Sequence, residues 1–165
     1  MSRDSARIEQ QYERELAKNG VLMTLPVGKS MWPLLRSRRD QIVIERLDGD
    51  PCKNDVILYR RGDKYILHRL IGKKDGVWLI RGDNCLKAER DITRADMLGV
   101  LTGIYRGERY IDCRASRRYR AYVAVWRALY PIRAAIMVTG INLKRIARGL
   151  KAAVKGKKNA NLKAR

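Results

Sequence analysis

The sequence contains no phenylalanine, a single histidine and only three cysteines among 165 residues. The cysteines, Cys52, Cys85 and Cys113, are widely spaced and form no Cys-x-x-Cys pair. An odd number of scattered cysteines argues against a disulfide scaffold and a zinc site, and it is typical of a reducing compartment. We therefore expect neither a metal nor another cofactor.

Long apolar runs are also lacking. No stretch reaches the roughly 18 apolar residues that a membrane-spanning helix needs, and the longest uncharged run, Ala134–Leu143, is too short. Residues 1–20 hold four basic and four acidic residues without an apolar run, so no signal peptide is predicted. These absences predict a protein of the cytoplasm or of the periphery of the cytoplasmic membrane, and they leave its oligomeric state open.

Acidic residues are absent from the last third of the chain. Residues 1–112 hold 22 Lys and Arg against 17 Asp and Glu, whereas residues 113–165 hold 15 Lys and Arg and no acid. This block carries most of the net charge of +20 and favours contact with a polyanion. An anionic membrane surface, a nucleic acid and a merely solvated basic tail are the three interpretations.

Short apolar segments separated by turn residues fill residues 21–113. They follow a helix predicted at 3–18, and they indicate strands at 21–27, 41–47, 56–60, 65–71, 77–81, 97–106 and 109–113. This pattern predicts a mainly β fold, either a sandwich or a partly open barrel. The expected organisation is an N-terminal helix at 1–20, a β domain at 21–113, a basic amphipathic helical segment at 114–150 and a disordered basic tail at 151–165.

From Arg117 to Arg148 the pattern becomes helical. Arg117, Arg120 and Arg127 fall near one helix face, and Pro131 should kink or divide the segment. We interpret it first as two amphipathic helices that lie in a membrane interface. Packing of these helices on the β domain is the second interpretation, and nucleic-acid binding is the third.

One serine directly follows the first predicted strand, in the stretch Gly28-Lys29-Ser30-Met31-Trp32-Pro33. Such a turn can expose the Ser30 hydroxyl in a groove together with its own backbone N–H, which can then stabilise an oxyanion. Serine needs a base to become a nucleophile. His68 is the only histidine, and it lies on a predicted strand where a purely structural role is common. Lys64 is the alternative base.

Four motifs in order resemble the S24/S26 serine peptidases, and in particular the type I signal peptidases. They are Ser30-Met31-Trp32-Pro33, then Asn54-Asp55-Val56-Ile57-Leu58-Tyr59, then Leu67-His68-Arg69-Leu70-Ile71, and finally Gly82-Asp83-Asn84. The resemblance covers residues 21–106. It implies a signal-peptidase/LexA-like β core and places this chain with the branch of the family that uses histidine as the base.

The resemblance also implies roles for single residues. Ser30 is the expected nucleophile and backbone oxyanion donor, and His68 is the expected general base. Glu89 and Asp83 are both candidates for the acid that orients His68, and the choice between them stays open. Met31 and Pro33 are expected to bind substrate. Gly28 stands where family members can carry a side-chain oxyanion donor, so that donor must come from elsewhere or the backbone must suffice.

The expected function is therefore that of a serine endopeptidase that removes a signal or leader peptide from a precursor. The precursor is the expected partner, and an anionic membrane surface is a second partner through residues 114–150. A basic nucleic-acid-binding module is the alternative, although a compact recognition motif is missing. The other alternative is an inactive relative that keeps the fold as a peptide-binding scaffold.

Overall fold

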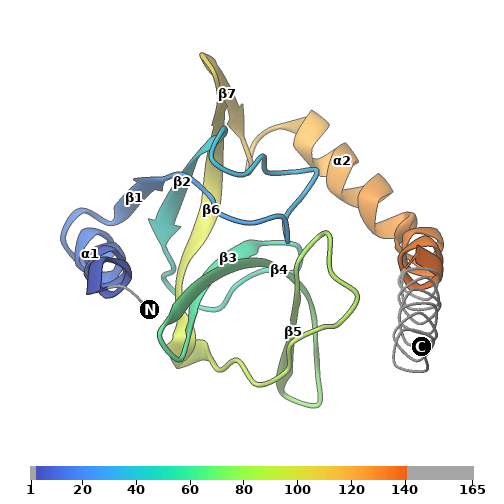
Figure 1. The fold of residues 1–165 in the computed structure, drawn as a ribbon, viewed down its shortest axis with the longest axis horizontal. Coiled ribbons are helices and arrows are strands. Elements are labelled where there is room, and N and C mark those ends of the chain that lie inside the picture. Colours follow the sequence, from blue (N-terminus) through green and yellow to red (C-terminus); the bar gives the residue numbers. More distant parts are fainter. Residues whose placement is uncertain (1–2, 141–165) are drawn as a thin grey trace, which may run out of the picture. The chain divides into compact units, whose positions relative to one another are not determined.

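The computed structural model describes residues 3–140 and is mainly β, as the sequence predicts (Figure 1). Helix α1 (Arg3–Asn19) precedes seven antiparallel strands: β1 (Val21–Thr24), β2 (Gln41–Arg46), β3 (Val56–Arg61), β4 (Lys64–Lys74), β5 (Val77–Arg81), β6 (Met97–Arg106) and β7 (Arg109–Asp112). A short 3-10 helix (Arg94–Asp96) precedes β6, and helix α2 (Arg117–Ala128) follows β7.

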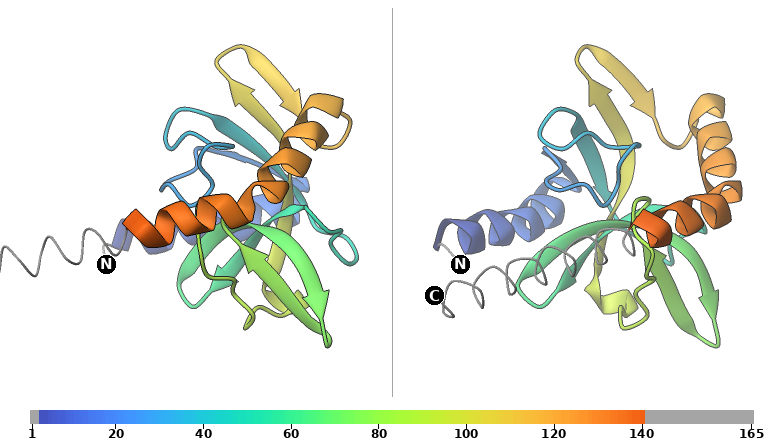
Figure 2. Two further views of the ribbon diagram at one scale, coloured as in Figure 1. Left: turned by 90° about the vertical axis from the view of Figure 1, so that its right-hand side faces the viewer. Right: turned by 45° about the vertical axis from the view of Figure 1, so that its right-hand side comes forward.

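The long strand β6 is the centre of the sheet. The order of the strands is β1-β2-β6-β3-β4-β5, and β7 also pairs with β6. One edge of β6 pairs with β2, while the other edge is shared by β3 near Val100 and by β7 from Gly103 onward. The β6–β7 hairpin consequently projects beyond the other strands (Figure 2).

Strand β3 is buried on both faces, so it separates two apolar clusters. Val56 and Leu58 belong to a cluster that includes residues of α1, β1 and β2, whereas Ile57 and Tyr59 belong to one with residues of β4 and β5. Successive side chains of a strand point to opposite faces, which explains this division. His68 pairs with Ile57 across β3 and β4.

The strand predicted at 21–27 is shorter than expected, because β1 ends at Thr24. Thr24 pairs with Ile42 near the beginning of β2, and Pro26 has no backbone N–H to continue a ladder. The Pro26 carbonyl instead accepts a hydrogen bond from the Arg38 N–H at 2.8 Å. The chain therefore leaves the sheet as a long loop, residues 25–40, which carries Ser30 (Figure 1).

The C-terminal helices begin on the sheet unit. The described residues fall into two compact units, one ending at Val123 and the other beginning at Ala124. Within the first unit, Tyr119 and Tyr122 pack against the apolar cluster of β1 and β2, and Val123 is buried. The first turns of α2 thus pack on the β core, which was the second interpretation of this segment.

Beyond α2 the chain continues as a helix at Tyr130–Gly140. Among the described residues no single helix is long and apolar enough to cross a membrane, but these two helices together meet that test with a 55° bend between them. The bend falls next to Pro131, where a break was predicted. Residues 141–150 of the predicted amphipathic segment and the predicted disordered tail at 151–165 lie outside the described residues.

Candidate active site

Ser30 lies in a turn at the tip of the loop between β1 and β2. Several hydrogen bonds hold this loop: the Gly28 N–H donates to Ser37 Oγ at 3.0 Å, and the Trp32 N–H donates to the Lys29 carbonyl at 3.2 Å. Gly28 has a φ of 99°, which favours glycine at this position. The Ser30 N–H donates no hydrogen bond within residues 3–140, so it is available to an oxyanion.

A cavity of about 280 Å³ opens beside Ser30. Its walls come from α1, the first four strands and the loop, and the lining residues include Leu25, Val27, Ser30, Met31 and Leu67. Leu25 and Val27 are 49% and 74% exposed. The predicted substrate-binding residue Met31 thus lines the cavity, whereas Pro33 does not and instead lines a second cavity.

His68 is held by a carboxylate. Its Nδ1 lies 2.8 Å from Glu89 Oε1 and 3.1 Å from the Tyr59 hydroxyl. A carboxylate only accepts hydrogen bonds, so Nδ1 carries the proton and Nε2 keeps its lone pair. Burial lowers the pKa of His68 below its usual 6.5, and Glu89 opposes that shift in part. The lowered pKa favours the neutral imidazole, which is the form that a general base needs.

Glu89 reaches His68 because the chain turns back after β5. The Glu89 backbone forms an isolated bridge with Ile80, with hydrogen bonds of 2.7 and 3.1 Å in the two directions. Its second carboxylate oxygen accepts a hydrogen bond from Arg61 at 3.0 Å. Backbone pairing and this ion pair thus fix the carboxylate that contacts His68.

Asp83 has a different partner. Both of its carboxylate oxygens accept hydrogen bonds from Arg69, at 2.8 and 2.7 Å, and the two side chains are almost completely buried. Arg69 also donates to the Asn54 carbonyl at 2.8 Å. Of the two acids that the sequence leaves open, Glu89 contacts His68, whereas Asp83 joins its loop to the strand that carries His68.

The loop after β5 also contacts the Ser30 turn. The Asn84 N–H donates to the Ser30 carbonyl at 2.7 Å, and its side-chain amide donates to the Lys29 carbonyl at 3.2 Å. Residues 82–84 therefore connect β4 with the loop between β1 and β2.

Gly82 lies next to both the Ser30 backbone carbonyl and His68 Nε2. A methyl group placed on its Cα would lie 2.7 Å from the Ser30 carbonyl oxygen and 2.9 Å from His68 Nε2. These two atoms are therefore separated by no more than the sum of those distances. The Ser30 hydroxyl makes no hydrogen bond to His68 within residues 3–140. His68 is also not a lining residue of the cavity, because Leu67 and His68 point to opposite faces of β4.

Tyr59 is a residue of this site that sequence analysis missed. It follows Ile57 by two residues on β3, so it lies diagonally across from His68 on the same face of the sheet. Burial and the nearby Glu89 carboxylate raise its pKa far above the usual range, so it stays a phenol. Aligning the predicted strands β3 and β4 in their pairing register could have identified Tyr59.

Lys64, the alternative base, is an exposed residue at the start of β4.

Among the described residues no group of three or more His, Cys, Asp or Glu side chains is arranged to hold a metal ion. No family model, no curated protein and no solved structure matches this chain.

Proposed function

We propose that this protein is a serine endopeptidase of the signal-peptidase-like S24/S26 kind, which cleaves a signal or leader segment from a precursor. The observation that carries the proposal is that the Ser30 backbone carbonyl and His68 Nε2 both lie next to Gly82, while Glu89 holds His68 Nδ1 on the far side of the imidazole. The four ordered motifs that resemble this peptidase group contain all three of Ser30, His68 and Gly82.

In the proposed reaction the Ser30 oxygen attacks the scissile carbonyl carbon while His68 Nε2 takes the hydroxyl proton. The Ser30 N–H donates to the oxyanion. The carbon–nitrogen bond then breaks, and His68 returns the proton to the leaving amine. Water attacks the resulting ester with His68 again as base, which releases the acid and restores the hydroxyl. Glu89 stabilises the imidazolium that forms in each step.

The cavity beside Ser30 supports an extended, apolar substrate segment. Leu25 and Val27 line the cavity with much of their apolar surface exposed, and they directly follow Thr24, the last residue of β1. An extended segment that crosses this surface would bury both side chains and bring its carbonyl to Ser30. The apolar part of a leader peptide would be such an extended, apolar segment.

The test uses an acylating probe, because the natural precursor is unidentified. A fluorophosphonate should label the folded protein at Ser30, and Ser30→Ala and His68→Ala should each abolish the label. Ser116→Ala, which removes a hydroxyl outside the Ser30 cavity, is the matched control and should label normally. Labelling that survives His68→Ala would overturn the assignment of the base. Absence of labelling in the folded wild type would favour an inactive peptide-binding relative.

We also propose peripheral attachment to an anionic membrane through the helices that begin at Arg117. Val125, Ile132 and Ile136 are between 58% and 66% exposed on this segment, which holds arginines and no acid. The guanidinium of Arg133 lies 3.4 Å from the centre of the Trp126 ring, an arrangement suited to a membrane interface. Co-sedimentation with phosphatidylglycerol vesicles, and its loss in a chain without residues 124–165, would test this attachment.

A further inference from the structure

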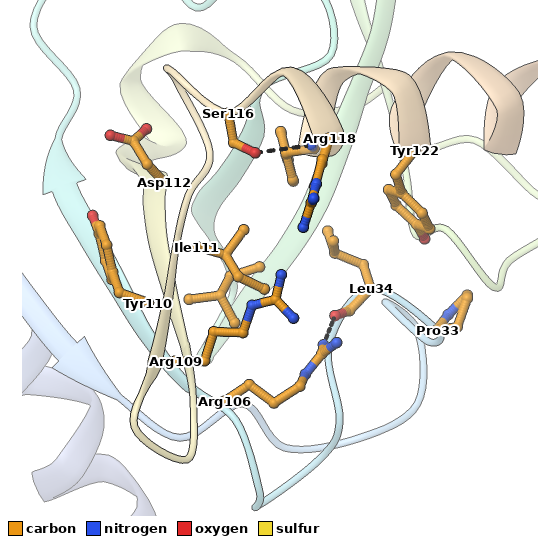
Figure 3. A pocket seen from close by; sticks show the side chains of 12 residues that line it. Pro33, Leu34, Arg106, Arg109, Tyr110, Ile111, Asp112, Ser116, Arg118 and Tyr122 are labelled. Carbon is orange, nitrogen blue, oxygen red and sulfur yellow. Dashed lines mark hydrogen bonds between the residues drawn. The ribbon is translucent and has the colours of Figure 1, made fainter.

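A second cavity, of about 320 Å³, lies between the β6–β7 hairpin, the start of α2 and the loop that carries Ser30 (Figure 3). It is separate from the cavity beside Ser30, because the two share no lining residue. Pro33 and Leu34 form one wall and Ile111 contributes to another. The cavity is large enough for a small organic ligand.

Two arginines point into this cavity from opposite sides. Arg109 extends from β7 and Arg118 from the first turn of α2, and their guanidinium groups are directed toward one another (Figure 3). Within residues 3–140 neither side chain makes a hydrogen bond or an ion pair. Two like charges that face a shared space repel each other, and an anion placed between them would remove that repulsion.

The other charged groups of the cavity are already occupied. Arg106 donates to Asp40 at 2.9 Å and to the Leu34 carbonyl at 2.9 Å. Asp112 accepts the backbone N–H groups of Arg114 and Ala115, both at 2.7 Å, and its carboxylate points away from the cavity (Figure 3). Arg106 is thus paired with Asp40, whereas neither Arg109 nor Arg118 forms an ion pair with Asp40 or Asp112.

We propose that this cavity binds a small ligand that carries a phosphate group, with Arg109 and Arg118 as its two charged contacts. Guanidinium groups donate paired hydrogen bonds to phosphate oxygens, and the N-terminus of α2 adds a favourable dipole beside them. Leu34 and Ile111 offer apolar surface to a substituent on the phosphate. The source of the phosphate is a soluble metabolite or the headgroup of an anionic lipid. The proposal does not depend on the peptidase function.

Calorimetric titration of the full chain with phenyl phosphate, at about 0.15 M NaCl to screen weak surface attraction, tests this site. The variant R109Q/R118Q should raise the Kd roughly tenfold or more, because two charge-assisted contacts are lost. The matched control R117Q/R120Q removes two other arginine charges, at positions of α2 that are exposed, as Arg109 and Arg118 are, but that do not line the cavity. It should change the Kd less than about twofold.

The source is distinguished by a second titration with phosphatidylglycerol vesicles. Weaker vesicle binding in R109Q/R118Q than in R117Q/R120Q identifies a lipid headgroup, whereas equal vesicle binding with impaired phenyl phosphate binding identifies a soluble ligand. Both variants should unfold in urea at the wild-type midpoint. The proposal is overturned if wild type does not bind phenyl phosphate, or if the two variants bind it equally well.

Discussion

Gly82→Ala tests most directly whether Ser30 and His68 act together across Gly82. The added methyl would lie 2.7 Å from the Ser30 carbonyl oxygen, 2.8 Å from Cys85 Sγ and 2.9 Å from His68 Nε2. Ordinary contacts of a carbon atom are about 3.5–4.0 Å, so these neighbours must move away from the methyl by roughly 0.6–1.3 Å. Gly82 does not adopt a positive φ, so the substitution adds bulk without backbone strain.

We expect Gly82→Ala to lower the rate of fluorophosphonate labelling about 100-fold, since a shift of about 1 Å in a catalytic group costs that much. The free energy of unfolding should fall by about 1–3 kcal/mol, because the site is overpacked. Gly72→Ala is the matched control: it adds the same methyl in open space and likewise without positive φ. If a folded Gly82→Ala protein is labelled at the wild-type rate, the proposed role of the contacts around Gly82 is refuted.

Three further predictions concern the neighbouring groups. The labelling rate should fall as pH decreases and be half-maximal below pH 6.5, because burial lowers the pKa of His68 and only the neutral ring accepts a proton. Glu89→Gln removes a charge that raises this pKa, so the midpoint should move lower still and the plateau rate should fall; an unmoved midpoint would contradict the contact. Asp83→Asn should cost about 3–5 kcal/mol of unfolding free energy in urea, because it leaves the buried Arg69 charge uncompensated. Arg46→Gln breaks an exposed pair and should cost less than about 1 kcal/mol, and equal losses would refute this distinction.

The positions of the strands were predictable because turns and alternation are local signals. The predicted strand at 77–81 coincides with β5, and the predicted hairpin around Gly107 coincides with β6 and β7. The helix predicted at 3–18 matches α1 to within one residue at its end. The mainly β class follows from these elements alone. The predicted strand through Val27 was too long, since pairing with β2 stops at Thr24.

The amino-acid sequence by itself determined the helices and strands and pointed to Ser30 and His68, because both kinds of prediction depend only on short stretches of neighbouring residues. Only the tertiary structure decided which acid contacts His68. In the sequence, Glu89 and Asp83 are equally good candidates for this acid. In the structure, backbone pairing with Ile80 positions Glu89 against the imidazole, whereas Asp83 forms an ion pair with Arg69. The sequence also did not predict that Arg109 and Arg118 line one cavity. Their guanidinium groups come together only when the β6–β7 hairpin packs beside the start of α2. Contacts between distant segments depend on pairing and packing, which no local pattern encodes.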